Sequence, residues 1–127
     1  MRFVIVLLIA GCSPTVDSVI TAQPYIGLSE RQHRTELREF TGVDPVQVEW
    51  CAAFVNAVLE LDGIPGSASV SDVPLMARSF LTWGEPVEPE DIQRGDVVIF
   101  PRGDKGWQGH VGFYVETQDG RWVILGG

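Results

Sequence analysis

Basic residues are scarce in this chain. Its 127 residues include 9 Lys and Arg against 17 Asp and Glu, which gives a formal net charge of −8 at pH 7. Proteins that bind nucleic acid need a basic surface that neutralises phosphates, and this composition leaves little material for one. We therefore expect no nucleic-acid partner.

Cysteine and histidine are also scarce, with two residues of each type. Zinc sites take three or four ligands, mostly Cys, His and carboxylates, and His33 and His110 are far apart in the sequence. We therefore expect no metal site and no other cofactor. Cys12 and Cys51 allow at most one disulfide, which excludes a disulfide-rich scaffold.

Long apolar runs and low-complexity segments are missing as well. The apolar run at residues 3–10 is too short to cross a bilayer, which takes about 20 apolar residues. The remaining composition, 45% hydrophobic and 20% charged, is typical of a globular protein. A chain of this length has room for one domain.

The N-terminus has the layout of an export signal. Arg2 precedes the apolar run, and small residues then lead into Cys12. The pattern resembles the signal of bacterial lipoproteins, whose cysteine is lipidated and becomes the mature N-terminus. This resemblance implies a signal peptide at residues 1–11 and a membrane anchor through lipid on Cys12. Ser13 resembles the sorting residue of lipoproteins on the periplasmic face of the outer membrane.

Two alternatives to this interpretation stay open. If the start codon is assigned wrongly, the protein is cytoplasmic or phage-encoded. If Cys12 and Cys51 form a disulfide, the protein is structural and has no free thiol. With lipid on Cys12, in contrast, Cys51 is a lone thiol in an oxidising compartment and needs a function.

Helical patterns precede strand patterns along the chain. Residues 12–24 predict a tether with Ser, Thr and Pro, and residues 25–127 predict the folded domain. Turn and capping residues predict helices at 29–40, with Ser29 as N-cap, at 48–62 and at 73–83. Alternation of period two predicts strands at 97–100, 110–116 and 121–126, the last two joined by a type I′ turn at Asp119-Gly120. This order predicts an α+β fold with N-terminal helices packed on a small antiparallel sheet.

Cys51 lies in the first turn of the second predicted helix. Free N–H groups and the positive end of the helix dipole stabilise a thiolate there, lower the cysteine pKa and can hold an oxyanion. Cys51 is therefore placed for nucleophilic attack. The alternative is an inert buried cysteine, since free cysteine is among the most buried residue types.

His110 begins a predicted strand between Gly109 and Gly112, which leave space beside it. A cysteine at a helix N-terminus facing a histidine on a strand is the general arrangement of thiol hydrolases. Spacing alone does not establish this role, because a lone histidine in a strand is more often structural. His33 lies among charged residues on the first predicted helix, and we assign it no function.

Four segments in the same order resemble one protein family. These are Trp50-Cys51-Ala52-Ala53-Phe54-Val55-Asn56, Ala77-Arg78-Ser79-Phe80-Leu81, Gly95-Asp96-Val97-Val98-Ile99-Phe100 and Gly109-His110-Val111-Gly112-Phe113-Tyr114-Val115. They are similar to NlpC-type and CHAP-like cell-wall hydrolases, which have a papain-like fold. The resemblance implies Cys51 as nucleophile, His110 as base and an amide bond of peptidoglycan as substrate.

One departure from the family concerns the residue that orients the histidine. In the family it follows the equivalent of Leu125-Gly126-Gly127, where this chain stops. A regular hairpin around Asp119-Gly120 pairs Phe113 with Gly126 and places the partner of His110 two residues past the end. We therefore expect a domain that is incomplete at its C-terminal strand.

The leading hypothesis is a peptidoglycan endopeptidase or amidase. The alternative is a catalytically weak or inactive lipoprotein of the same fold that binds cell wall. Trp50 and Trp107 are weak candidates for substrate binding; Trp107 lines the cleft or packs beside it. The acidic residues between positions 85 and 96 form either a solvated loop or a rim that attracts an ammonium-bearing substrate.

Overall fold

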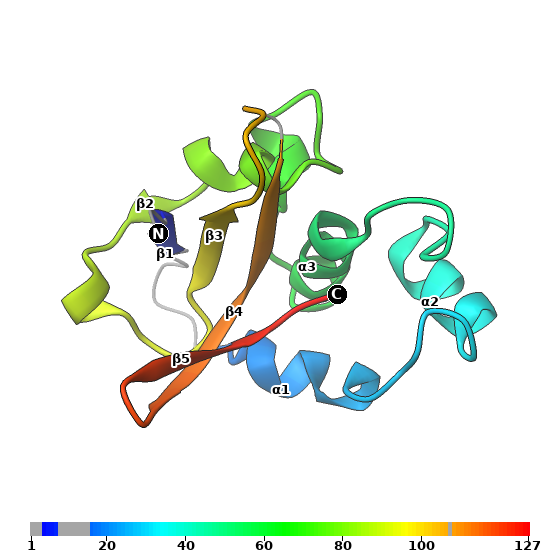
Figure 1. Ribbon diagram of the computed structural model, residues 1–127, viewed down its shortest axis with the longest axis horizontal. Helices are drawn as coiled ribbons and strands as arrows, with labels where there is room; N and C mark the ends of the chain where they lie inside the picture. Colours follow the sequence, from blue (N-terminus) through cyan, green and yellow to red (C-terminus); the bar gives the residue numbers. More distant parts are fainter. Residues whose placement is uncertain (1–3, 8–15, 107) are drawn as a thin grey trace.

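The computed structural model describes residues 4–7, 16–106 and 108–127 of the chain (Figure 1). Helices dominate its first half and strands its second half, so the predicted α+β class is confirmed. The helices are α1 (Ser18–Ala22), α2 (Arg34–Thr41) and α3 (Cys51–Leu61), with 3-10 turns η1 (Gln23–Tyr25), η2 (Ser67–Ser69), η3 (Ala77–Thr82) and η4 (Pro89–Asp91). The strands are β1 (Val4–Leu7), β2 (Glu85–Pro86), β3 (Val97–Pro101), β4 (Gly109–Gln118) and β5 (Arg121–Leu125).

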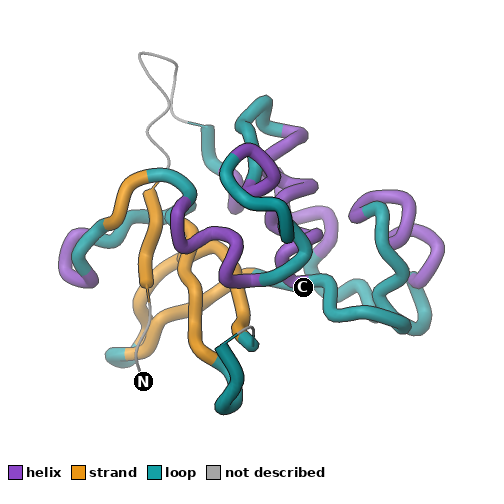
Figure 2. The backbone as a smooth tube through the Cα atoms, turned by 90° about the horizontal axis from the view of Figure 1, so that it is seen from above, coloured by secondary structure: helices purple, strands orange, loops and turns teal. Residues whose placement is uncertain are grey.

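The strands form one antiparallel sheet in the order β2-β1-β3-β4-β5. The sheet occupies one side of the molecule, and the α-helices α1, α2 and α3 lie on the other (Figures 1 and 2). Along β4, Val111 and Phe113 are fully buried and belong to the same core cluster as Phe54 and Val55 of α3. The central helix is thus fixed against the middle of the sheet, as its wide apolar surface predicts.

A buried polar network ties α3 to the segment between η2 and η3. The Asn56 side chain donates to Ser67 Oγ at 3.0 Å and to the Pro74 carbonyl at 3.1 Å, and it accepts from Ser67 N at 2.8 Å. Ser79 joins the network through Ser67 Oγ at 2.8 Å. The Pro74 carbonyl is thus bound by side chains, and the predicted α-helix at 73–83 is wrong: only the 3-10 helix η3 forms there.

The first predicted helix begins later than expected. The backbone N–H of Ser29 donates to His33 Nδ1 at 2.9 Å, and its carbonyl accepts from His33 N at 2.8 Å. These bonds close a turn at residues 30–33, and α2 then starts at Arg34 with His33 as its N-cap residue. Ser29 therefore stabilises the preceding turn and is not the N-cap.

Helix α1 lies within the segment predicted as a tether. Val19 is 2% exposed and Ala22 is fully buried against the core. Ser18 Oγ donates to Asp62 Oδ2 at 2.7 Å, and Thr21 donates to the other carboxylate oxygen, which joins α1 to the end of α3. The predicted domain start at residue 25 is therefore wrong, because the folded part already includes α1.

Residues 4–7 form strand β1, which pairs with β3 through Val4↔Ile99, Ile5↔Val98 and Val6↔Val97. These residues lie inside the predicted signal peptide, which we expected to take no part in the fold. Cys12, the predicted lipidation site, lies outside the described residues. The signal peptide at residues 1–11 and the lipid anchor stay predictions.

The hairpin between β4 and β5 has the predicted turn. Asp119 (φ 49°) and Gly120 (φ 73°) are both left-handed, as a type I′ turn requires. A β-bulge between Tyr114 and Glu116 then shifts the pairing by one residue, so Phe113 pairs with Leu125. The predicted pairing of Phe113 with Gly126 is wrong, and the end of β5 lies one residue closer to the start of β4, and so to His110, than expected.

Candidate active site

Cys51 is the first residue of α3, with Trp50 as N-cap residue. The helix therefore starts three residues later than predicted, and Cys51 lies at its extreme N-terminus, where backbone N–H groups have no helical acceptor. The thiol is free and 6% exposed. The structure thus gives no support to a Cys12–Cys51 disulfide.

His110 lies near the start of β4, opposite Phe100 of β3, and is half-buried. The approach to it is tight: a β-carbon at Gly109 would lie 3.1 Å from the Phe100 carbonyl oxygen. Arg78 Nε also donates to the Gln108 carbonyl at 2.7 Å, which anchors the chain just before β4. These contacts fix the backbone that carries the imidazole.

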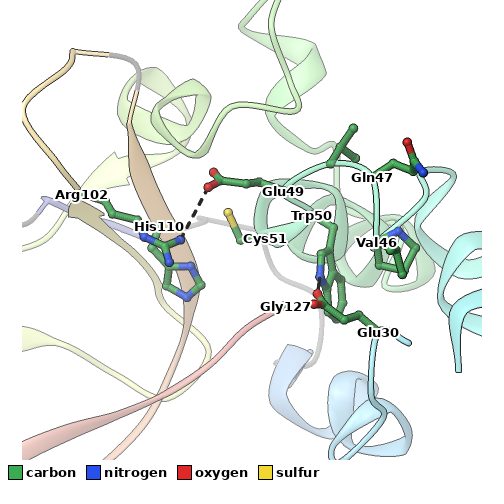
Figure 3. A pocket seen from close by; sticks show the side chains of 11 residues that line it. Glu30, Val46, Gln47, Glu49, Trp50, Cys51, Arg102, His110 and Gly127 are labelled. Atoms are coloured by element: carbon green, nitrogen blue, oxygen red, sulfur yellow. Dashed lines mark hydrogen bonds and ion pairs between the residues drawn. The ribbon is translucent and has the colours of Figure 1, made fainter. Parts of the chain in front are cut away.

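Cys51 and His110 line the same open cleft, of about 470 Å³, between the N-terminus of α3 and the sheet (Figure 3). Cys51 belongs to the same core cluster as Val111, the residue that follows His110 on β4. No hydrogen bond joins the two side chains in the described part of the chain. The cleft is lined by Glu30, Pro45, Val46, Gln47, Val48, Glu49, Trp50, Cys51, Arg102, His110 and Gly127.

Burial shifts the two candidate catalytic groups in opposite directions. It raises the pKa of the Cys51 thiol, although hydrogen bonds from the N–H groups of Val111 and Ala52 oppose the shift. Burial and the nearby Arg102 guanidinium lower the pKa of His110. The expected lowering of the cysteine pKa is therefore wrong, because desolvation outweighs the helix N-terminus. Near neutral pH the pair is a thiol beside a neutral imidazole.

The end of β5 closes one side of the cleft. A β-carbon at Gly126 would lie 3.2 Å from His110 Nε2, and one at Gly127 would lie 2.6 Å from the Trp50 ring. Trp50 is held in turn by a 3.1 Å hydrogen bond from its Nε1 to Glu30 Oε2. Trp50 therefore lines the cleft and supports the strand end beside His110. Trp107, the other tryptophan candidate, lies outside the described residues.

No side chain orients the imidazole in the described residues. The Nε2 atom of His110 faces the backbone of Gly126, on the β5 side. The position of the imidazole here thus depends on packing against β4 and β5.

An exposed ion pair crosses the cleft mouth. Arg102, which follows β3, and Glu49, which precedes α3, approach within 3.9 Å above Cys51 and His110 (Figure 3). We did not predict either residue from the sequence. Glu49 stands two positions before Cys51, so the sequence could have predicted its position beside the site. The position of Arg102 beside the site depends on the pairing of β3 with β4.

The acidic stretch between positions 85 and 96 does not line this cleft. Glu85, Glu88, Glu90 and Asp91 are exposed elsewhere, which agrees with a solvated surface rather than a rim of the site. Asp96 differs, since it is buried, with Oδ2 accepting from Gln93 N at 2.8 Å and Oδ1 without a described partner. Burial raises the pKa of its carboxyl.

The described residues contain no group of three or more His, Cys, Asp or Glu that suits a metal ion. None of their helices is long and apolar enough to cross a membrane. Comparison with protein-family models, curated proteins and solved structures gives no match for this chain.

Proposed function

We propose that the protein is a cysteine hydrolase that cleaves an amide bond in peptidoglycan, as an endopeptidase or amidase. Cys51 is the nucleophile and His110 the general base. The observation that carries the proposal is their shared cleft, with the thiol at the N-terminus of α3 and the imidazole on the adjoining strand.

Because Cys51 is a thiol and His110 a neutral imidazole near neutral pH, the first proton transfer goes from Cys51 to His110. His110 accepts the Cys51 proton as the sulfur attacks the amide carbonyl carbon, and the backbone N–H of Cys51 donates to the oxyanion. His110 then gives the proton to the leaving amine, which departs as the thioester forms. Water, activated by His110, hydrolyses the thioester and restores the thiol.

The substrate class rests on the four sequence segments similar to NlpC-type and CHAP-like hydrolases. The papain-like fold is part of the same proposal: a helix that starts at the nucleophile packs on an antiparallel sheet that carries the base. We also propose a lipid anchor on Cys12 and a place in the bacterial cell envelope. Mass spectrometry of the mature N-terminus tests this, since an unmodified chain that retains residues 1–11 contradicts it.

The second candidate is a peptidoglycan-binding protein with weak or no activity. Two observations favour it: burial raises the pKa of the nucleophile, and no described side chain orients His110. Loss of the orienting residue in a serine triad lowers turnover by about 10⁴. A cysteine retains more activity, because it is the stronger nucleophile.

Digestion of purified peptidoglycan under reducing conditions separates the candidates. We expect new amino groups and peptide fragments with the wild-type chain, none with Cys51→Ala and far fewer with His110→Ala. Binding of the Cys51→Ala variant to intact peptidoglycan provides the control for folding. Equal binding by both proteins, with no fragments from the wild type, favours the second candidate; neither binding nor cleavage contradicts both.

A further inference from the structure

Arg102 stands where two hollows meet beside His110. One is the cleft that contains Cys51; the other, of about 520 Å³, lies over the end of β3. Arg102, His110 and Gly127 line both of them. A chain bound across the reacting pair and extending to both sides therefore passes the Arg102 guanidinium.

The present partner of Arg102 holds it loosely. The 3.9 Å separation from Glu49 exceeds the usual 2.7–3.2 Å of a hydrogen bond. The two side chains are 63% and 69% exposed, and such pairs contribute little stability. The donors of the guanidinium thus remain largely available at the cleft mouth.

Arg102 is the cationic side chain best placed to contact a bound molecule in the cleft. Among the described residues that line the two hollows it is the only Arg or Lys. Glu30 is engaged by Trp50, and Glu49 faces Arg102. A planar guanidinium binds a carboxylate through two parallel N–H···O bonds, a geometry that the present contact with Glu49 does not reach.

We propose that Arg102 binds a carboxylate of the substrate and that this carboxylate displaces Glu49. The inference rests on the proposed function and narrows its substrate class to peptides that carry a free carboxylate close to the scissile amide. Because the protein has a net charge of −8, its long-range field repels such a substrate. Selection must then come from a contact at short range, and Arg102 is the residue placed to make it.

Two alkylating agents test this without any hydrolysis. The Cys51 thiolate displaces iodide from the CH₂ carbon of either reagent, so that iodoacetate adds a carboxymethyl group and iodoacetamide a carbamidomethyl group. Only iodoacetate has a carboxylate. The readout is the ratio of their alkylation rates at Cys51, followed by peptide mass spectrometry at low ionic strength in the full-length chain. Since both reagents need the same thiolate, the ratio is insensitive to changes in the cysteine pKa.

We expect Arg102→Gln to lower the iodoacetate-to-iodoacetamide ratio by about two- to fivefold, the range that an exposed ion pair supports. Arg121→Gln, at the exposed start of β5, removes the same charge away from the cleft and should leave the ratio near that of the wild type. Glu49→Gln should raise the ratio more than Glu60→Gln, a matched change at the far end of α3.

An equal response of Arg102→Gln and Arg121→Gln would overturn the inference, because only the total charge would then matter. The inference would also be overturned if Glu49→Gln and Glu60→Gln changed the iodoacetate-to-iodoacetamide ratio by the same factor. Failure of the proposed function looks different: peptidoglycan is not cut, whatever the two reagents do. Thermal unfolding of each variant confirms that it is folded.

Discussion

At the scale of single residues, burial disfavours the charged forms of both Cys51 and His110. The proposed mechanism therefore starts from a neutral pair with His110 as general base, not from a preformed thiolate–imidazolium pair. In that mechanism the proton moves only when the sulfur attacks. The reactivity of Cys51 should therefore depend on pH and on His110 in a defined way.

We expect alkylation of Cys51 by iodoacetamide to accelerate with pH, with a midpoint above the ordinary thiol value of 9.0. His110→Ala should slow the reaction at pH 7 by roughly tenfold, because the base is lost. Above the thiol pKa the wild type and the variant should react alike. Peptide mass spectrometry at Cys51 across the pH range measures this.

His33→Ala is the matched control, since His33 lies at the start of α2 and does not line the cleft. It should leave the alkylation rate unchanged at every pH. Equal slowing by both substitutions, or no slowing by either, would remove His110 from the mechanism.

The candidate pair was predictable because each residue has a local signature. Cys51 starts an apolar helix, and His110 stands between glycines at the start of a strand. Arg102 and Gly126 have no such signature, since their places beside His110 arise only when β3, β4 and β5 come together in space. The direction of the cysteine pKa was also missed, because burial is a tertiary property that a helix-start argument does not contain.

At the scale of elements, strands β3, β4 and β5 and the hairpin turn were predicted well, whereas β1 and β2 were not predicted. Alternation and the Asp119-Gly120 pair are short-range features that persist in any tertiary context. The bulge was missed, because it accompanies the packing of Val115 against the core. The helix starts were missed where side chains bind backbone groups, as His33 does at Ser29 and Asn56 does at Pro74.

The turn offers a direct test of this local control. Gly120 has a φ of +73° and open space around it, so a side chain there meets strain but no clash. We expect Gly120→Ala to lower the free energy of unfolding by about 1 kcal/mol. Gly120→Asn should cost clearly less, because asparagine tolerates the left-handed conformation. Chemical denaturation of the two variants measures the difference, and equal losses would contradict the turn assignment.

At the scale of the whole molecule, the α+β class and the packing of helices on one side of the sheet followed from the order of patterns along the chain. The extent of the domain did not, because α1 is too short to show a period, and its burial depends on Asp62 and the core. The pairing of β1 with β3 was also not predicted, because the apolar run at residues 3–10 was interpreted as part of a signal peptide.

Stability against pH is also a property of the whole molecule, and two buried groups influence it in opposite directions. The pKa of His110 is lower in the folded chain than its ordinary value of 6.5. The free energy of unfolding therefore decreases as the pH falls below 6.5, because the unfolded chain then binds a proton that the folded chain does not. Asp96 has a raised pKa, so its ionised form destabilises the fold near neutral pH, and this cost disappears as the pH falls towards 3.8.

We expect Asp96→Asn to raise the free energy of unfolding at pH 7 by about 1 kcal/mol, since a buried charge is removed. The advantage over the wild type should shrink as the pH falls and vanish below the carboxyl pKa values. Urea denaturation between pH 7 and pH 4 checks this. An advantage that is constant across this range would mean that Asp96 does not titrate with folding.

The burial of the Asp96 carboxyl therefore makes folding a proton-exchanging reaction. In mildly acidic solution the chain takes up protons at Asp96 as it folds and releases protons from His110. Acidification thus stabilises the fold through Asp96, just before β3, and destabilises it through His110 on β4, the neighbouring strand that carries the proposed base.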